Sequence, residues 1–239
     1  TSLVASGRIR VVGEMANLDR LRVDASVDRF DASLFEYAIR NASPIRVALD
    51  RNIVRVTEMR LVGQDTQLDV SGILDLHNER IAIRTTGDAN LGILQGFVSN
   101  MRSSGRAAPS AALEGPLGEP LVSGTMTVDN GRLRHFSLPH ALESISGVMR
   151  FDSRSIRLDE LSARLGGGAV TFGGNIGFEG YRVSRLDVTM NGTGMLVRFP
   201  EGMRSTVDAE LALQGTVDSA TLSGEVTVRE GQYTRAFDT

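Results

Sequence analysis

The sequence predicts a mainly β chain whose antiparallel strands share one continuous apolar face. Three observations support this fold class. Apolar and polar residues alternate along most of the chain, turn-forming residues separate the alternating segments, and blocks of similar sequence recur about 100 residues apart.

The alternation is clear between Leu21 and Asp28, where Val23 and Val27 face one way and Asp24 faces the other. The same pattern recurs at residues 68–76, 170–178 and 207–213. We expect roughly thirteen to fifteen such strands, joined by turns such as those at 77–79 and 179–180. Alternation of this kind indicates antiparallel strands with one buried and one wet face.

Two segments break the pattern and predict one or two short helices or bulky loops. Residues 32–40 and 91–101 both carry apolar residues at helical spacing. The second is followed by small and polar residues at 103–110, which predict a flexible linker or loop. We therefore expect one repeat unit at 1–102 and a second, with the start of a third, at 111–239, within one continuous structure cut from a longer chain.

Internal repetition is the most informative property of the sequence. Two blocks match at an offset of 100 residues, a third matches at 102, and a fourth at 105, as if one hairpin had grown by three residues. The matched segments are 113–115 with 213–215, 123–131 with 223–231, 56–72 with 158–174, and 83–91 with 188–196. The order of the blocks predicts units of about 100 residues.

Composition excludes several classes of protein. The net charge of −3 comes without a basic stripe, so we expect no nucleic-acid partner. The absence of cysteine excludes disulfides, thiolate catalysis and cysteine-ligated zinc. The sequence contains no apolar run of about 18 residues, the length that a helix needs to cross a bilayer. Aromatic residues make up only 5% of the chain, which favours a thin structure with a smooth aliphatic face.

The sequence contains no recognisable catalytic or metal-binding constellation. Its three histidines, His77, His135 and His140, lack a third ligand at metal-binding spacing. The glycines at 166–168 precede a strand and not a helix, so they predict a turn and not a phosphate-binding loop. We therefore expect no enzyme activity, no cofactor and no metal site.

The apolar stripe is the remaining candidate site. Composition alone favours a dry core, packed against a second sheet in a sandwich or barrel, over an open groove that receives an apolar ligand. The predicted groove residues are Leu21, Val23, Val27, Leu68, Val70, Leu74, Leu76, Val170, Phe172, Ile176, Phe178, Leu186, Val188, Met190, Val207, Leu211, Leu213, Leu222, Val226 and Val228.

Four segments carry motifs in a recognisable order. Residues 161–178, LSARLGGGAVTFGGNIGF, place three consecutive glycines before a strand. In residues 207–233, VDAELALQGTVDSATLSGEVTVREGQY, an apolar strand ends in glycine and a hairpin follows, and residues 61–76 and 85–94 look like further units. These segments resemble the TamB family, the inner-membrane component of the translocation and assembly module, and AsmA-like relatives share the pattern more loosely.

The resemblance implies properties that composition does not. Such proteins are anchored in the inner membrane of diderm bacteria, span the periplasm, and curl their repeats into a U-shaped β-groove with an apolar interior. The resemblance implies phospholipid as the ligand, transport between the two membranes, and an outer-membrane barrel partner of the TamA type that supports assembly of outer-membrane proteins. The family's N-terminal membrane helix and a clear barrel-docking segment are not seen, so we expect the remainder of the chain to supply the anchor.

Two alternatives from other classes stay open at this point. A closed β-sandwich or β-solenoid would act as a passive scaffold, with its apolar faces packed together. A docking platform would present its free sheet edge to other strands.

Overall fold

The structure is a computed structural model that describes residues 2–13, 21–34, 37–96, 100–136, 140–180, 182–199 and 202–234. These residues form fifteen strands and one short 3₁₀ helix, η2, at Leu91–Gly96. The strands are β1 (Ser2–Val12), β2 (Arg22–Leu34), β3 (Tyr37–Asn41), β4 (Ile45–Asp50), β5 (Ile53–Gly63), β6 (Thr66–Asp75), β7 (Arg80–Asn90), β8 (Met101–Pro116), β9 (Leu121–His135), β10 (Leu142–Ser153), β11 (Ser155–Leu165), β12 (Gly168–Glu179), β13 (Arg182–Val197), β14 (Met203–Thr216) and β15 (Ser219–Tyr233).

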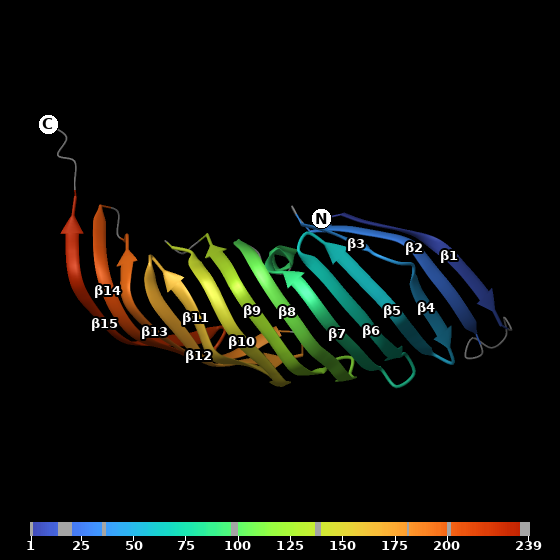
Figure 1. The fold of residues 1–239 in the computed structure, drawn as a ribbon. Coiled ribbons are helices and arrows are strands. Elements are labelled where there is room, and N and C mark those ends of the chain that lie inside the picture. The colour runs from blue at the N-terminus through green and yellow to red at the C-terminus, as the bar shows by residue number, and fades with distance from the viewer. Residues whose placement is uncertain are drawn as a thin grey trace.

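All fifteen strands belong to one antiparallel sheet, as the sequence predicts (Figure 1). Strands follow one another in chain order from β1 to β15, and β3 and β4 share the place between β2 and β5. Each strand therefore pairs with neighbours that are close in sequence. The described residues form this one sheet and no second sheet packs on it, so their architecture is not a sandwich.

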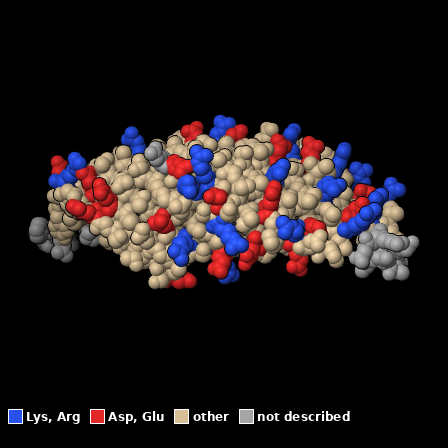
Figure 2. Space-filling view, turned by 90° about the horizontal axis from the view of Figure 1, so that it is seen from below, with Lys and Arg blue, Asp and Glu red and all other residues tan. Residues whose placement is uncertain are grey.

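One face of the sheet is charged and solvated. Cross-strand pairs such as Arg60–Asp69, at 2.7 Å, and Arg106–Asp88, at 3.0 Å, lie on this face with both side chains well exposed. Figure 2 shows cations and anions side by side over the surface that it presents. Exposed pairs of this kind contribute at most about 1 kcal/mol each, so they keep the outer face soluble more than they hold the fold together.

The sheet curls toward its uncharged face. Helix η2 follows β7, yet it contacts β2, although β3, β5, β6 and β7 lie between them in the sheet order. Only a strongly curved sheet can bring these elements together at one rim. Figure 1 shows the strands bending along their length and η2 beside the upper ends of β7 and β8.

Glycine is required where the strands bend. Gly174 has φ +109°, and a Cβ there would lie 2.1 Å from the backbone oxygen of Asp187. Gly224 has φ +138°, and its Cβ would lie 2.0 Å from the oxygen of Glu210. A similarly close approach occurs in every third strand from β6 onward, at Gly72, Gly124, Gly174 and Gly224. These positions let neighbouring backbones close in and the sheet curve.

The repeat read from the sequence lies in register across the sheet. In the first copy Val56 pairs with Gly72, and Gly72 pairs with Ile83. In the second copy Leu158 pairs with Gly174, and Gly174 pairs with Val188. The row then continues through Leu113 and Val122 in the first copy, and through Leu213 and Leu222 in the second. Equivalent residues of the two copies thus occupy equivalent places.

Two local expectations need correction. Residues 103–110 are not a flexible linker or loop but lie inside β8, one of the two longest strands. Small side chains favour turns in isolation, but here both neighbouring strands satisfy the backbone hydrogen bonds of this segment. The division into units at that point stays a prediction.

The predicted helices are confirmed only in part. Of residues 91–101, Leu91–Gly96 form η2 and Met101 begins β8, while 97–99 lie outside the described residues. Residues 32–40 are not helical where they are described, because they belong to β2 and β3; residues 35–36 are outside the description. Pairing between these two strands overrides the helical spacing.

The close approach at Gly174 generates a stability prediction. We expect Gly174→Ala to lower the free energy of unfolding by about 2 kcal/mol or more, because the methyl group meets the backbone of β13 and φ is positive. Gly118→Ala is the matched control, since nothing lies within 4 Å of a Cβ there; its change should stay within about 0.5 kcal/mol. Urea unfolding followed by circular dichroism measures both, and equal effects would contradict the account of the bend.

A carboxylate on the outer face supports a bulge in β13. Asp208 accepts a 2.8 Å hydrogen bond from the backbone N–H of Gly194 and also pairs with Arg229 of β15. These contacts hold the pKa of Asp208 below its ordinary value, the Gly194 bond contributing most. The folded-state pKa of Asp208 is depressed, so its ionised carboxylate contributes to the free energy of unfolding above the unfolded pKa of about 3.9. This contribution is lost as pH falls through the folded-state pKa.

We therefore expect Asp208→Asn to make the melting temperature less dependent on pH below about pH 4. Glu210→Gln is the control, because Glu210 lies on the same strand and forms no ion pair with another described residue. Thermal melts from neutral to acidic pH compare the three proteins. An unchanged pH slope in the Asp208 variant would show that these contacts are not formed.

Candidate functional site: the apolar face of the groove

The candidate site is the uncharged face of the curled sheet, here called the apolar face. Its residues are placed by strand register, since directly paired residues of antiparallel strands point to the same side. One unbroken row of paired residues runs from β1 to β9 and contains only aliphatic side chains and one glycine. The row consists of Ile9, Ala25, Val47, Val56, Gly72, Ile83, Leu113 and Val122.

A second row of the same character overlaps the first on β8 and β9 and reaches the far edge of the sheet. It consists of Pro109, Met126, Met149, Leu158, Gly174, Val188, Leu213 and Leu222. Neither row holds a charged or hydrogen-bonding side chain. Together they form an apolar path across the whole sheet, from β1 to β15.

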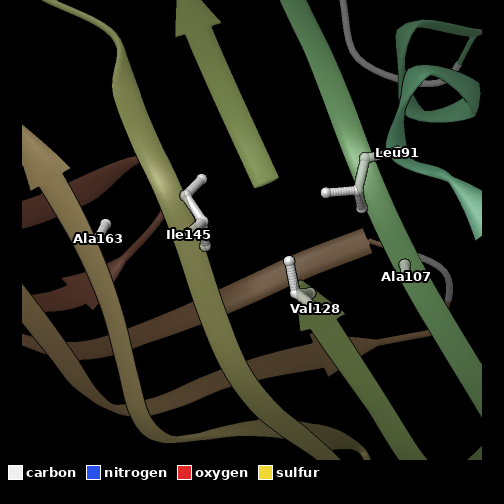
Figure 3. Packing of buried hydrophobic residues seen from close by; sticks show 5 residues of the cluster. All are labelled: Leu91, Ala107, Val128, Ile145 and Ala163. Atoms are coloured by element: carbon white, nitrogen blue, oxygen red, sulfur yellow. The ribbon is translucent and has the colours of Figure 1, made fainter. Parts of the chain in front are cut away.

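Side chains of the apolar face bury one another although no second sheet covers them. One cluster joins Leu91 of η2 to Ala107, Val128, Ile145 and Ala163 of β8, β9, β10 and β11. Figure 3 shows Leu91, Val128 and Ile145 directed toward one another. A second cluster on β12, β13 and β14 contains Val170, only 1% exposed, and Met195, 2% exposed. Such burial in a single layer requires the concave side of a curved sheet.

The groove is less covered toward its two ends. Ile9 on β1 is 73% exposed and Leu222 on β15 is 64% exposed, whereas Leu158 in the same type of row is 8% exposed. Beside the β8–β9 and β10–β11 turns and the end of β12, a hollow of about 180 Å³ is lined by Leu113, Val122, Phe151, Ile156 and Phe178 among others. The apolar face is therefore buried in the two clusters at the middle of the sheet and accessible at this hollow and on the edge strands β1 and β15.

Helix η2 is fixed over one rim of the groove by polar contacts. The Asn90 side chain accepts a 2.8 Å hydrogen bond from the Gly92 N–H at the start of the helix. The Ser103 hydroxyl donates to the Leu91 carbonyl at 2.8 Å, and Gln95 donates to the Ser103 carbonyl at 2.9 Å. Anchored in this way, η2 places Leu91 against the cluster described above.

A buried tyrosine supports the same rim. The Tyr37 hydroxyl donates to the Gln64 carbonyl at 2.9 Å and contacts the hydroxyl of Thr66, which accepts the Asn90 N–H at 2.9 Å. Burial raises the pKa of Tyr37, so the phenol stays protonated as a donor. These contacts tie β3 to β6 and β7 beneath η2.

Most of the sequence-predicted groove residues lie on the apolar face. Eighteen of the twenty are in strands whose register points them to that side; Leu21 precedes β2, and Leu76 lies in the turn after β6, about half exposed. Leu222, Val226 and Val228 point to the same side but lie on the exposed edge strand β15. Whether these side chains contact a ligand is a separate matter, taken up as a proposal below.

Strict alternation missed residues that follow bulges. Register shifts occur between Val56 and Met59, between Leu158 and Leu161, and between Gly192 and Met195. Each shift moves the apolar positions from even to odd numbers, or the reverse, within one strand. Met195 and Val197 of β13 were missed for this reason, and a search that allowed one change of phase per strand would have found them. The predicted list holds no residue of β5 or β11, so Met59, Leu61, Leu161, Ala163 and Leu165 were missed together with the rest of their strands.

The described residues bring no set of metal ligands together beside the apolar face. Within the described ranges, no group of three or more histidine, cysteine or acidic residues could hold a metal ion. His77 lies in the exposed turn after β6, where Asp75 accepts its backbone N–H at 3.1 Å. His140 accepts the backbone N–H of Arg198 at 2.9 Å. Among the helices of the described residues, none has the length and hydropathy that crossing a membrane would need.

Comparison with known families agrees with the sequence motifs. Residues 157–239 match the family model described as the TamB C-terminal domain. The matched segment begins in β11 and continues through β15. It therefore contains the second cluster and the part of the second row from Leu158 to Leu222. No curated protein and no solved structure matches the chain.

The TamB family is a non-enzymatic component of transport and assembly in the bacterial envelope, and its members work with partner proteins. The match thus implies an envelope location. It confirms the resemblance carried by the glycine-rich and hairpin motifs at 161–178 and 207–233. Residues 157–239 of this chain therefore resemble the TamB C-terminal domain.

Proposed function

We propose that this segment is part of a lipid conduit across the periplasm, in which the apolar face shields phospholipid acyl chains between the inner and the outer membrane. The observation that supports the proposal is the apolar path from β1 to β15, on a face that no second sheet of the described residues covers. The parent protein would be anchored in the inner membrane. A barrel of the TamA type would be its partner at the outer membrane and would link it to outer-membrane protein assembly.

The energetic need for such a path is large. Each exposed CH₂ group costs about 0.8 kcal/mol in water, so a wet sixteen-carbon chain costs on the order of 12 kcal/mol. A wall of Leu, Val, Ile and Met side chains removes most of this cost while the headgroup stays in solvent. The charged residues of the sheet stay on the opposite face, where they do not interrupt the path.

Transfer also needs neighbouring positions of similar affinity, because one tight site would trap the lipid. Equivalent residues recur at equivalent places in the two sequence repeats, as with Val56 and Leu158 or Ile83 and Val188. Aliphatic and glycine positions without hydrogen-bonding groups hold an acyl chain without fixing its place. This uniformity supports movement along the path more than storage at one site.

The first test places a photo-crosslinking amino acid at Phe172 or Leu211 on the apolar face. Thr171 and Glu210 are matched controls, because each is the chain neighbour of a test residue and points to the outer face. We expect phospholipid adducts, detected by mass spectrometry after irradiation with lipid vesicles, from the apolar-face positions. Equal adduct yields from the apolar-face positions and the outer-face controls would contradict the proposal.

The second test introduces a charge into the path. Leu211 lies between Met190 and Gly224 in the sheet, so Leu211→Asp puts a carboxylate where an acyl chain would pass. We expect this variant to bind a fluorescent phospholipid at least about tenfold more weakly, because desolvating the carboxylate costs more than 1.4 kcal/mol.

Ala212→Asp is the control, since Ala212 is the next residue and faces outward between Thr189 and Ser223. Circular dichroism establishes that both variants keep the sheet. Equal lipid binding by the Leu211 and Ala212 variants would count against a lipid path on the apolar face.

A further inference from the structure

Arginines gather at the rim of the groove that carries η2, here called the η2 rim. At this rim β8 and β10 begin and β9 and β11 end, so residues of four neighbouring strands lie side by side (Figure 1). The set, here called the basic cluster, consists of Arg102, Arg132, Arg134 and Arg164. Arg102 lies directly opposite Arg134. Glu143 of β10 lies opposite Arg164 and pairs with Arg132 at 3.4 Å, so the four arginines form one contiguous patch.

Two arginines of the basic cluster repel each other. Arg102 and Arg134 are directly paired, and like charges at paired positions destabilise a sheet. Arg102 is exposed and forms no ion pair with another described residue. A second opposed pair, Arg150 and Arg157, has an acid beside it, because Arg150 also contacts Asp159. A bound anion would offset the repulsion between Arg102 and Arg134 in the same way.

The inner side of the same strand ends is apolar. Leu133 of β9 lies opposite Leu142 of β10, which lies opposite Leu165 of β11. Leu133 and Leu142 pack against the first buried cluster of the apolar face. Side chains alternate between the two faces of a strand, so arginine and leucine follow one another at the rim, as in 132–134 and 164–165. An apolar wall and a row of cations thus meet at the η2 rim.

The opposite rim carries a balanced charge. There the ends of the same four strands and their turns, residues 113–124 and 150–158, hold as many acidic residues as arginines. Arg154 of the β10–β11 turn pairs with Glu119 of the β8–β9 turn at 3.0 Å. Across β8–β11 the excess of positive charge therefore lies at the η2 rim.

We propose that the basic cluster binds the phosphate group of a phospholipid whose acyl chains lie against Leu133, Leu142 and Leu165. This inference rests on the proposed function and deepens it, because it assigns the headgroup to one rim of the groove. A guanidinium group can donate two parallel hydrogen bonds to a phosphate, and it stays charged at physiological pH. The long arginine stem can reach past the rim while its charged end stays in water. Free phosphate would gain nothing from the leucines beside the cluster, so the occupant is a lipid carried in the groove.

Cations recur farther along the same rim. Arg198 follows β13, and Arg204 lies at the start of β14. Both are exposed, and neither forms an ion pair with another described residue. Successive cations would let a phosphate pass from one arginine to the next while the acyl chains move along the apolar face.

Lipids that share their acyl chains and differ in the phosphate-bearing headgroup test the site. The probes are fluorescent phosphatidylglycerol and fluorescent diacylglycerol, presented to the full chain. We expect the wild type to bind phosphatidylglycerol more tightly. The double variant Arg102→Gln with Arg164→Gln should bind phosphatidylglycerol about threefold to tenfold more weakly, since each exposed charge contact contributes little. Its binding of diacylglycerol should not change.

Arg157→Gln with Arg185→Gln is the matched control. Both arginines are exposed at the opposite rim, and neither forms an ion pair with another described residue. Circular dichroism establishes that both double variants keep the sheet. Equal weakening by the two double variants would assign the effect to overall charge and overturn the site. A wild type that binds both lipids equally would overturn the site and leave the conduit standing, whereas one that binds neither would contradict both proposals.

Protection of arginines from phenylglyoxal distinguishes a carried lipid from other anions. The chain is loaded from phosphatidylglycerol vesicles, the vesicles are removed by gel filtration, and modification is followed by peptide mass spectrometry. Arg102 and Arg164 should react more slowly than in the lipid-free chain, while Arg157 and Arg185 should be unaffected. Equal protection by inorganic phosphate alone would indicate an adventitious ion only. Protection that is lost with the vesicles would indicate a membrane surface, and either result would overturn the proposal.

Discussion

Backbone pairing between neighbouring strands is the interaction on which the rest of this structure depends. A sandwich holds each strand by its neighbours and by a second sheet, but the described strands here have only their neighbours and, at one rim, η2. The register of each pair therefore decides which side chains reach the apolar face. A slip of one residue would move a whole strand's apolar side chains to the charged side.

Curvature converts this single layer into a structure that can bury side chains. Neighbouring residues such as Val170 and Met195 reach almost complete burial without a covering sheet because the concave side brings them together. Glycines that admit a close backbone approach, such as Gly174 and Gly224, make the bend possible. Apolar surface stays accessible on the edge strands β1 and β15, where Ile9 and Leu222 are exposed.

Much of the fold could be predicted from the sequence, because period-2 alternation and the repeat are direct consequences of sheet geometry. The single antiparallel sheet and most of the predicted groove residues follow from them. Bulges could not be predicted, since they change the phase of alternation inside one strand, as between Leu158 and Leu161. Residues 103–110 look like a linker in isolation and become a strand only because β7 and β9 lie on both sides. The role of η2 depends on a contact with β2 that no local pattern encodes.

The central claim is that the apolar face takes up acyl chains. The most direct measurement is mass spectrometry of the chain purified from bacterial envelopes without delipidation. The account predicts phospholipid that stays bound through purification and is released on unfolding. A chain that is folded yet free of phospholipid, and that takes up none from vesicles, would contradict it.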